Sequence, residues 1–216
     1  MKNINCLLLL TLVTGLNAAG ADDAGARLER ATNVFATLTK SEHGIRADQL
    51  DRADCIAVIP GFKKGAVVVG VGHGRGFLSC RNGGVWSAPA AIALDSGSLG
   101  VQIGGEEMDL VILSVDRDQR AKLLSDRFAI GSDASAAWGN GKSAHDDPNA
   151  TILFYGVTKG AFAGFGLDGA TLKPDESGTE ALYGKKLTNS AAVEGGTSTP
   201  DVARPFIAQL AHASGR

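Results

Sequence analysis

Two adjacent lysines, Lys63 and Lys64, are the residues best placed to bind an anion. They follow Pro60-Gly61, a pair typical of turns, so a phosphate or carboxylate group could approach both ammonium groups. The alternative is a solvated turn that binds nothing. Basic and aromatic residues that could line the same side, for the anion and for an apolar chain attached to it, are His73, Arg75, Arg81, Phe62 and Phe77.

Residues 70–76 (GVGHGRG) place glycine at every second position of a predicted strand. This spacing does not fit the G-x-G-x-x-G pattern of a dinucleotide-binding loop. Alternating glycines leave one face of a strand without side chains, so a helix, a large side chain or a ligand must fill the space. Close packing is the favoured interpretation.

No group of residues has the spacing of a catalytic or metal site. His43, His73, His145 and His212 are scattered along the sequence, and nothing combines a nucleophile, a base and an oxyanion hole. We therefore expect a protein that is not an enzyme and that needs no cofactor.

The composition limits the choice of partner. The 216 residues carry a formal net charge of −2, and no block rich in lysine or arginine stands out, so nucleic acid is not expected as a partner. Strong non-specific attraction to anionic membranes is not expected either, and lipid binding would need a local site. The 29 glycines fall mainly on strand-like segments, which favours a tightly bent or barrel-like sheet.

The first 21 residues resemble a cleaved signal peptide. Lys2 precedes a short apolar stretch from Cys6 to Leu16, and Ala19-Gly20-Ala21 supplies the small residues of a cleavage site. The apolar stretch is too short to span a bilayer as a helix. We expect the protein to be exported and to be either periplasmic or associated with the outer envelope.

Export would leave two cysteines, Cys55 and Cys80, in an oxidising compartment. Cys55 opens one predicted strand and Cys80 closes another, so a disulfide is the favoured interpretation. The alternative is two buried thiols that never meet.

The apolar spacing predicts helices at residues 24–39, 45–53 and 201–213, the first packing on a core rather than entering a membrane. Short apolar runs separated by turn residues predict strands between residues 55 and 115, the first ended by Pro60, and again at 151–158 and 161–169. The predicted fold class is α+β: a glycine-rich, mainly antiparallel, barrel-like sheet flanked by N-terminal and C-terminal helices.

Several motifs together resemble the SYLF domain. They are residues 55–61 (CIAVIPG), 71–76 (VGHGRG), 81–94 (RNGGVWSAPAAIAL), 98–105 (SLGVQIGG), 109–111 (DLV), 161–169 (AFAGFGLDG) and 182–184 (LYG). The resulting division is a signal peptide at 1–21, a SYLF domain at 22–186, and a linker with a C-terminal helix at 187–216.

The resemblance implies a membrane-associated, lipid-binding domain, similar in fold to BON-type α+β modules. Eukaryotic members of the family are linked to phosphoinositides and membrane remodelling, fungal members to actin, and bacterial relatives are small exported proteins. We expect a non-enzymatic protein of the bacterial envelope that binds a phospholipid or another envelope lipid, with headgroup contacts from the basic turn and acyl-chain contacts from Phe62 and Phe77. The alternative is a periplasmic protein-interaction or scaffold module that uses Trp86, Trp138 or an exposed strand edge to bind an envelope protein.

Overall fold

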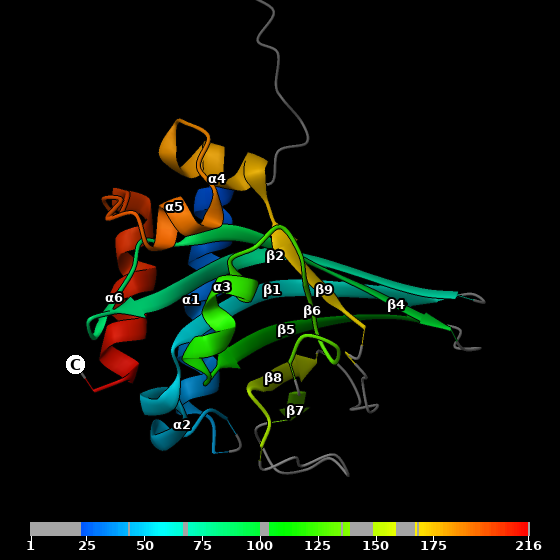
Figure 1. Cartoon of the computed structure of the whole chain (residues 1–216). Helices are drawn as coiled ribbons and strands as arrows, with labels where there is room; N and C mark the ends of the chain where they lie inside the picture. The colour runs from blue at the N-terminus through cyan, green and yellow to red at the C-terminus, as the bar shows by residue number, and fades with distance from the viewer. Residues whose placement is uncertain are drawn as a thin grey trace, which may run out of the picture.

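The computed structural model describes residues 23–42, 44–66, 69–99, 104–134, 136–138, 149–158, 167 and 169–215. The predicted signal peptide and almost all of the predicted strand 161–169 lie outside these residues. In the described part, helices from both ends of the chain lie against one face of a curled sheet (Figure 1). This arrangement confirms the predicted α+β class.

The sheet has nine strands among the described residues, in the order β6-β9-β4-β2-β1-β5-β8-β7, with β3 paired to β2. Every strand pairing is antiparallel except that of β7 with β8, which confirms the prediction of a mainly antiparallel sheet. The strands are β1 Cys55–Ala66, β2 Val69–Asn82, β3 Val85–Trp86, β4 Ala90–Leu99, β5 Gly104–Ser114, β6 Phe128–Ala129, β7 Ala136–Trp138, β8 Ile152–Thr158 and β9 Thr171–Pro174.

The helices begin at residues whose side chains suit that position. Asp23 accepts a hydrogen bond from the backbone N–H of Gly25 at the start of α1, and Asp175 accepts one from Gly178 at the start of α4. The helices are α1 Ala24–Lys40, α2 Ala47–Arg52, α3 Arg120–Leu123, α4 Glu176–Tyr183, α5 Asn189–Val193 and α6 Arg204–Ala213, with 3-10 helices η1 Arg117–Gln119 and η2 Asp201–Ala203.

The predicted helices 24–39 and 45–53 are confirmed to within two residues at each end, and the predicted helix 201–213 is the 3-10 helix η2 followed by α6. The segment predicted as a linker contains α5, whose Ala192 and Val193 are buried. The C-terminal part of the chain therefore packs into the same folded body as the sheet.

Each face of the sheet carries a buried core cluster. On the first, named the helix face, Phe35 of α1 and Phe206 of α6 pack over Val58 and Phe77. On the second, named the far face, side chains such as Leu78 form a separate core cluster with the short elements that follow β5. The apolar stripe of α1 is therefore a core stripe, as the sequence predicts.

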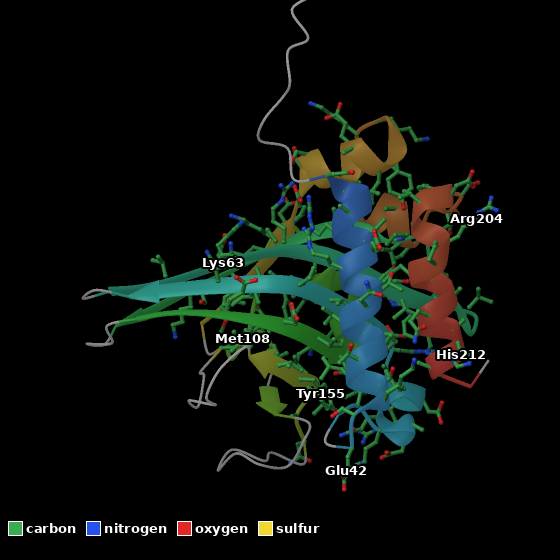
Figure 2. All side chains as sticks on the ribbon, turned by 180° about the vertical axis from the view of Figure 1, so that it is seen from behind. Glu42, Lys63, Met108, Tyr155, Arg204 and His212 are labelled. Atoms are coloured by element: carbon green, nitrogen blue, oxygen red, sulfur yellow. A yellow bond between two sulfur atoms is a disulfide. The ribbon has the colours of Figure 1, made fainter. Side chains whose placement is uncertain are left out.

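Four neighbouring strands, β4, β2, β1 and β5, extend well beyond α1 and α6 (Figures 1 and 2). Lys63 lies on this extended part, on the side from which α1 is seen in Figure 2. The helix face of the sheet is consequently covered at one end and open beyond the edge of α1.

Pro60 does not end the first strand, so that detail of the sequence prediction is wrong. β1 continues to Ala66, and Pro60-Gly61 forms a bulge, in which the six residues from Val58 to Lys63 oppose the five from His73 to Phe77 of β2. Gly61 adopts a φ of +62°, which glycine permits, and its N–H donates to Asp109 Oδ1 at 2.8 Å. The bulge thus accommodates proline inside a strand that is paired on both sides.

Candidate functional site

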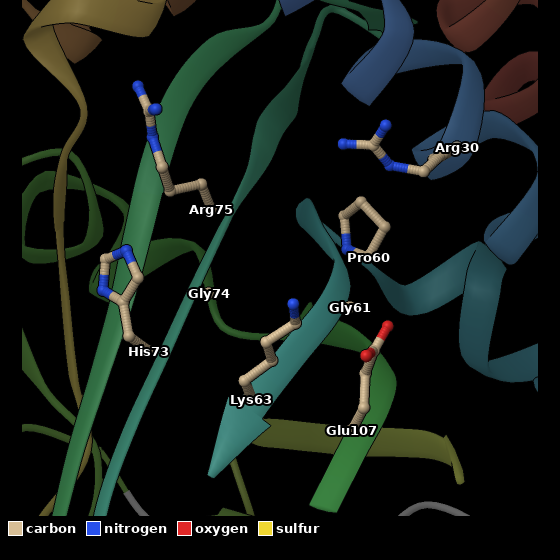
Figure 3. Close-up of a pocket in the computed structure, with 8 residues that line it drawn as sticks. All are labelled: Arg30, Pro60, Gly61, Lys63, His73, Gly74, Arg75 and Glu107. Atoms are coloured by element: carbon tan, nitrogen blue, oxygen red, sulfur yellow. The ribbon is translucent and has the colours of Figure 1, made fainter. Parts of the chain in front are cut away.

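A pocket of about 370 Å³ lies on the helix face, where the sheet emerges from under α1 (Figure 3). Its lining comes from α1, β1, β2 and β5, and it contains more basic than acidic side chains. The lining residues are Arg30, Pro60, Gly61, Lys63, His73, Gly74, Arg75 and Glu107.

The bulge determines which side chains enter the pocket. Before the bulge, the odd-numbered residues of β1, such as Ile59, pack on the far face. After the bulge, the even-numbered Phe62 packs there. Lys63 is therefore directed to the helix face, and Lys64 alternates to the far face. Only one of the two adjacent lysines lines the pocket.

The glycines of β2 make room for this arrangement. A Cβ atom on Gly72 or Gly74 would lie 2.6 Å or 2.9 Å from a ring atom of Phe62, which is completely buried. The bare face of the strand is thus filled by a large side chain, as the packing interpretation predicts.

A row of ionisable side chains crosses the pocket perpendicular to the strands. Glu107 opposes Lys63, Lys63 opposes His73, and His73 opposes Asp95, on β5, β1, β2 and β4. His73 Nδ1 lies 2.6 Å from Asp95 Oδ1, and Lys173 Nζ of β9 lies 2.5 Å from Asp95 Oδ2. Burial raises the pKa of Asp95, but the hydrogen bonds from Lys173 and His73 outweigh it, so the net pKa is lowered.

A second carboxylate fixes the arginine wall of the pocket. Asp175 accepts hydrogen bonds from Arg75 Nε and Nη2, both at 2.7 Å, and from Arg27 Nη1 at 3.0 Å. Burial raises the pKa of Asp175, but hydrogen bonds from the Gly178 N–H and from Arg75 bring it below its ordinary value. The charge of Arg75 is therefore largely balanced before any ligand arrives.

The structure brings together three of the residues predicted for the site: Lys63, His73 and Arg75. It places Phe62 and Phe77 in the cores on opposite faces of the sheet, both with an exposed fraction of 0%. In this conformation neither phenylalanine is accessible to an acyl chain.

Arg81 shares the helix face but lies six residues further along β2 than Arg75, roughly 20 Å away at the usual strand rise. Its guanidinium donates to the carbonyl oxygens of Ala53 and Leu50 and stacks over the Trp86 ring. These contacts give Arg81 a role in holding α2 and β3 on the sheet. Trp86 itself is buried, and the side chain of Trp138 lies outside the described residues.

Two charged residues of the pocket are absent from the predicted site, Arg30 and Glu107. The predicted helix at 24–39 gives Arg30 an exposed position, but only the packing of α1 on the sheet brings it beside β1. To predict Glu107 as a pocket residue, one would need the register of β1 with β5, which no local pattern in the sequence provides.

The described residues contain no group of three or more His, Cys, Asp or Glu side chains able to hold a metal ion. Within the same residues, every helix is too short or too polar to cross a membrane.

Cys55 and Cys80 form a disulfide between β1 and β2, so the favoured interpretation of the two cysteines is confirmed. Both residues are buried, and they lie directly opposite each other in the register of the two strands. The bond closes the β1–β2 hairpin at its base, below the bulge.

Replacing both cysteines with serine is expected to lower the free energy of unfolding by about 3 kcal/mol, because the loop that the bond closes regains its freedom in the unfolded chain. Denaturant titration under oxidising conditions measures this loss. Reduced wild-type protein should match the double variant, and a reducing agent should change the variant no further. Equal stability of oxidised wild type and variant would contradict the prediction.

The protein is an α+β domain with one curled sheet and a mainly basic pocket beside its N-terminal helix. Residues 95–213 match the Ysc84 family, described as Las17-binding protein actin regulator. The chain therefore belongs to the Ysc84 family, whose domain is the SYLF domain, as the sequence motifs predict.

Curated relatives support this assignment. Protein YSC84 of Saccharomyces cerevisiae is 27% identical over 208 residues, covering 89% of this chain and 44% of the relative. LAS seventeen-binding protein 3 of the same organism is 26% identical over 212 residues, covering 91% of this chain and 46% of the relative. SH3 domain-containing YSC84-like protein 1 of Xenopus laevis is 33% identical over 140 residues, covering 62% of this chain and 42% of the relative.

The chain thus spans less than half the length of these relatives. No solved structure matches it, and the similarity to BON-type modules stays a prediction.

Proposed function

We propose that this is a non-enzymatic binding protein of the bacterial envelope, and that its pocket binds the headgroup of a phospholipid or another envelope lipid. The observation that carries the proposal is the open pocket lined by Lys63, His73, Arg75 and Arg30. An anionic oxygen in this space can accept hydrogen bonds from ammonium and guanidinium groups at once.

The position of the pocket supports contact with a surface. It lies where four strands project past the helices, so a headgroup in a bilayer can reach it without displacing α1 (Figures 1 and 2). Because Phe62 and Phe77 are core residues, the proposed contact is with the headgroup rather than with the acyl chains.

Export is part of the proposal. The disulfide supports it, since disulfides persist in oxidising compartments such as the periplasm and are rare in the cytosol. The apolar segment at residues 6–16 and the small residues that follow it support a cleaved signal peptide.

The two lysines allow a matched test of the pocket. Lys63→Glu is expected to weaken vesicle binding about tenfold, because it replaces the ammonium group that faces the ligand by a carboxylate. Lys64→Glu makes the same change in net charge on the far face and is expected to cost far less. Co-sedimentation with vesicles of phosphatidylcholine, phosphatidylethanolamine and phosphatidylglycerol measures both.

Equal losses for the two lysine variants would mean general electrostatic attraction and would remove the pocket from the proposal. Absence of wild-type binding to every vesicle composition would remove lipid binding altogether.

A protein partner is the second candidate. The Ysc84 family is described as Las17-binding protein actin regulator, and one relative is named LAS seventeen-binding protein 3. For this chain, the exposed side chains of Val71 and Val85 are apolar positions at which a partner could dock. Cross-linking in the native envelope, followed by identification of the cross-linked protein, separates this role from lipid binding.

A further inference from the structure

We propose that the headgroup taken by this pocket is zwitterionic, with its phosphate at Lys63 and a primary ammonium group at Glu107. The inference rests on the proposed lipid-binding function and specifies its ligand. The chemical class is that of a phosphoethanolamine headgroup.

The charges around the pocket are mostly balanced within the protein. Arg75 forms a bidentate ion pair with Asp175, which also binds Arg27. Asp95 is bonded by both His73 and Lys173. A ligand with several phosphates would meet these carboxylates as well as the cations, so the pocket does not suit a polyanion.

Lys63 and Glu107 are different. They are direct cross-strand neighbours on β1 and β5, and Figure 3 shows the amine and the carboxylate both pointing into the open space. Among the described residues, neither side chain forms an ion pair, with the other or with a third group. The pocket therefore presents one unmatched positive group and one unmatched negative group side by side.

The bulge places the carboxylate. A Cβ atom on Gly61 would lie only 3.3 Å from Glu107 Oε1, so the carboxylate lies over the glycine backbone rather than swinging towards Lys63. The two charged groups thus lie on neighbouring strands, with the carboxylate beside the bulge. A ligand that carries both signs on neighbouring groups can satisfy both side chains together.

The lining also discriminates between two common zwitterions. A primary ammonium group has three N–H donors for Glu107, whereas a quaternary ammonium group has none and is usually bound by aromatic faces. None of the residues that line this pocket is a tryptophan, tyrosine or phenylalanine. Ethanolamine is therefore preferred over choline.

The test uses three vesicle compositions: phosphatidylcholine alone, phosphatidylcholine with phosphatidylethanolamine, and phosphatidylcholine with phosphatidylglycerol. Wild-type protein is expected to bind the ethanolamine vesicles about tenfold more tightly than phosphatidylcholine alone, the effect of one charge-assisted hydrogen-bonded pair. Excess soluble phosphoethanolamine, but not phosphocholine, should release the bound protein.

Glu107→Gln removes the carboxylate charge while keeping the side-chain shape. It is expected to abolish the preference for ethanolamine and, by removing a repulsive charge, to leave binding to phosphatidylglycerol vesicles equal or stronger. A folding defect would weaken binding to all three vesicle compositions. Loss of the ethanolamine preference without weaker binding to phosphatidylglycerol vesicles therefore identifies the pocket as the cause. Glu180→Gln, at an exposed position on α4 outside the pocket, is the control and should behave as wild type.

The outcomes separate the two proposals. Wild-type binding that shows no ethanolamine preference, or a preference that survives in Glu107→Gln, overturns the zwitterion and leaves headgroup binding standing. Absence of binding to all three compositions overturns both.

Discussion

Replacing Asp175 with alanine is expected to lower the free energy of unfolding by about 3–5 kcal/mol, the range for removing one partner of a buried ion pair. Asp175 is 8% exposed, and its carboxylate joins Arg27 of α1, Arg75 of β2 and the first turn of α4. Arg27 is itself 1% exposed, so the substitution leaves a guanidinium buried without this carboxylate. Denaturant titration measures the loss.

The same carboxylate gives the stability a dependence on pH. The pKa of Asp175 is lower in the folded protein than in the unfolded chain, so folding favours its ionised form. The stabilisation is fully present above the ordinary carboxyl pKa and is lost as the pH falls through the lower folded-state value. Between neutral and acidic pH, the gap in stability between wild type and Asp175→Ala should therefore narrow.

Two further variants isolate the cause. Asp201→Ala removes an exposed carboxylate that pairs with Arg204 near the start of α6, and it should change stability little. Asp175→Asn keeps a side chain able to cap α4 but loses the charge, so it should fall between wild type and alanine. An Asp175→Ala protein as stable as Asp201→Ala would refute the central role of this carboxylate.

Gly76→Ala is expected to destabilise the protein by at least about 3 kcal/mol, at the upper end for overpacked sites. A Cβ atom at Gly76 would lie 2.0 Å from the carbonyl oxygen of Val58 and 2.8 Å from Cα of Ile59. These are backbone atoms of the paired strand, which cannot rotate away as a side chain can. The added methyl group must therefore push β1 and β2 apart just before the bulge.

Gly97→Ala is the matched control for this effect. Gly97 lies on β4 of the same sheet, and a Cβ atom there would meet nothing within 4 Å. Its stability should equal the wild-type value or exceed it slightly, since alanine restricts the unfolded chain. Thermal unfolding compares the two variants, and equal melting temperatures would contradict the clash.

The elements that depend on local spacing could be predicted from the sequence. The apolar stripe through Leu28, Ala31 and Phe35 gives α1, and alternating glycine gives the close approach of β1 to β2. The end of β1 could not be predicted, because a proline that usually ends a strand is here accommodated by a bulge and by the side chain of Asp109, 48 residues away.

The site could be predicted only in part, because it also depends on contacts between residues that are distant in the sequence. His73 and Arg75 share a face because strand residues alternate, and this parity can be derived from the sequence alone. Lys63, Glu107 and Arg30 meet through strand register and helix packing, which depend on the whole fold. Phe62 looks like part of the same cluster in sequence, but the extra residue in the bulge turns it into the opposite core.

Because of that extra residue, the number of residues in the bulge matters as much as their identity. Deleting a single position at Pro60-Gly61 would restore simple alternation through β1, bringing the aromatic ring to water and the amine into an apolar interior. A substitution in this stretch changes one side chain, whereas a single-residue insertion or deletion is expected to exchange the faces of all the β1 side chains that follow it. Among homologous chains, the number of residues between Val58 and Lys63 should therefore vary less than their identity.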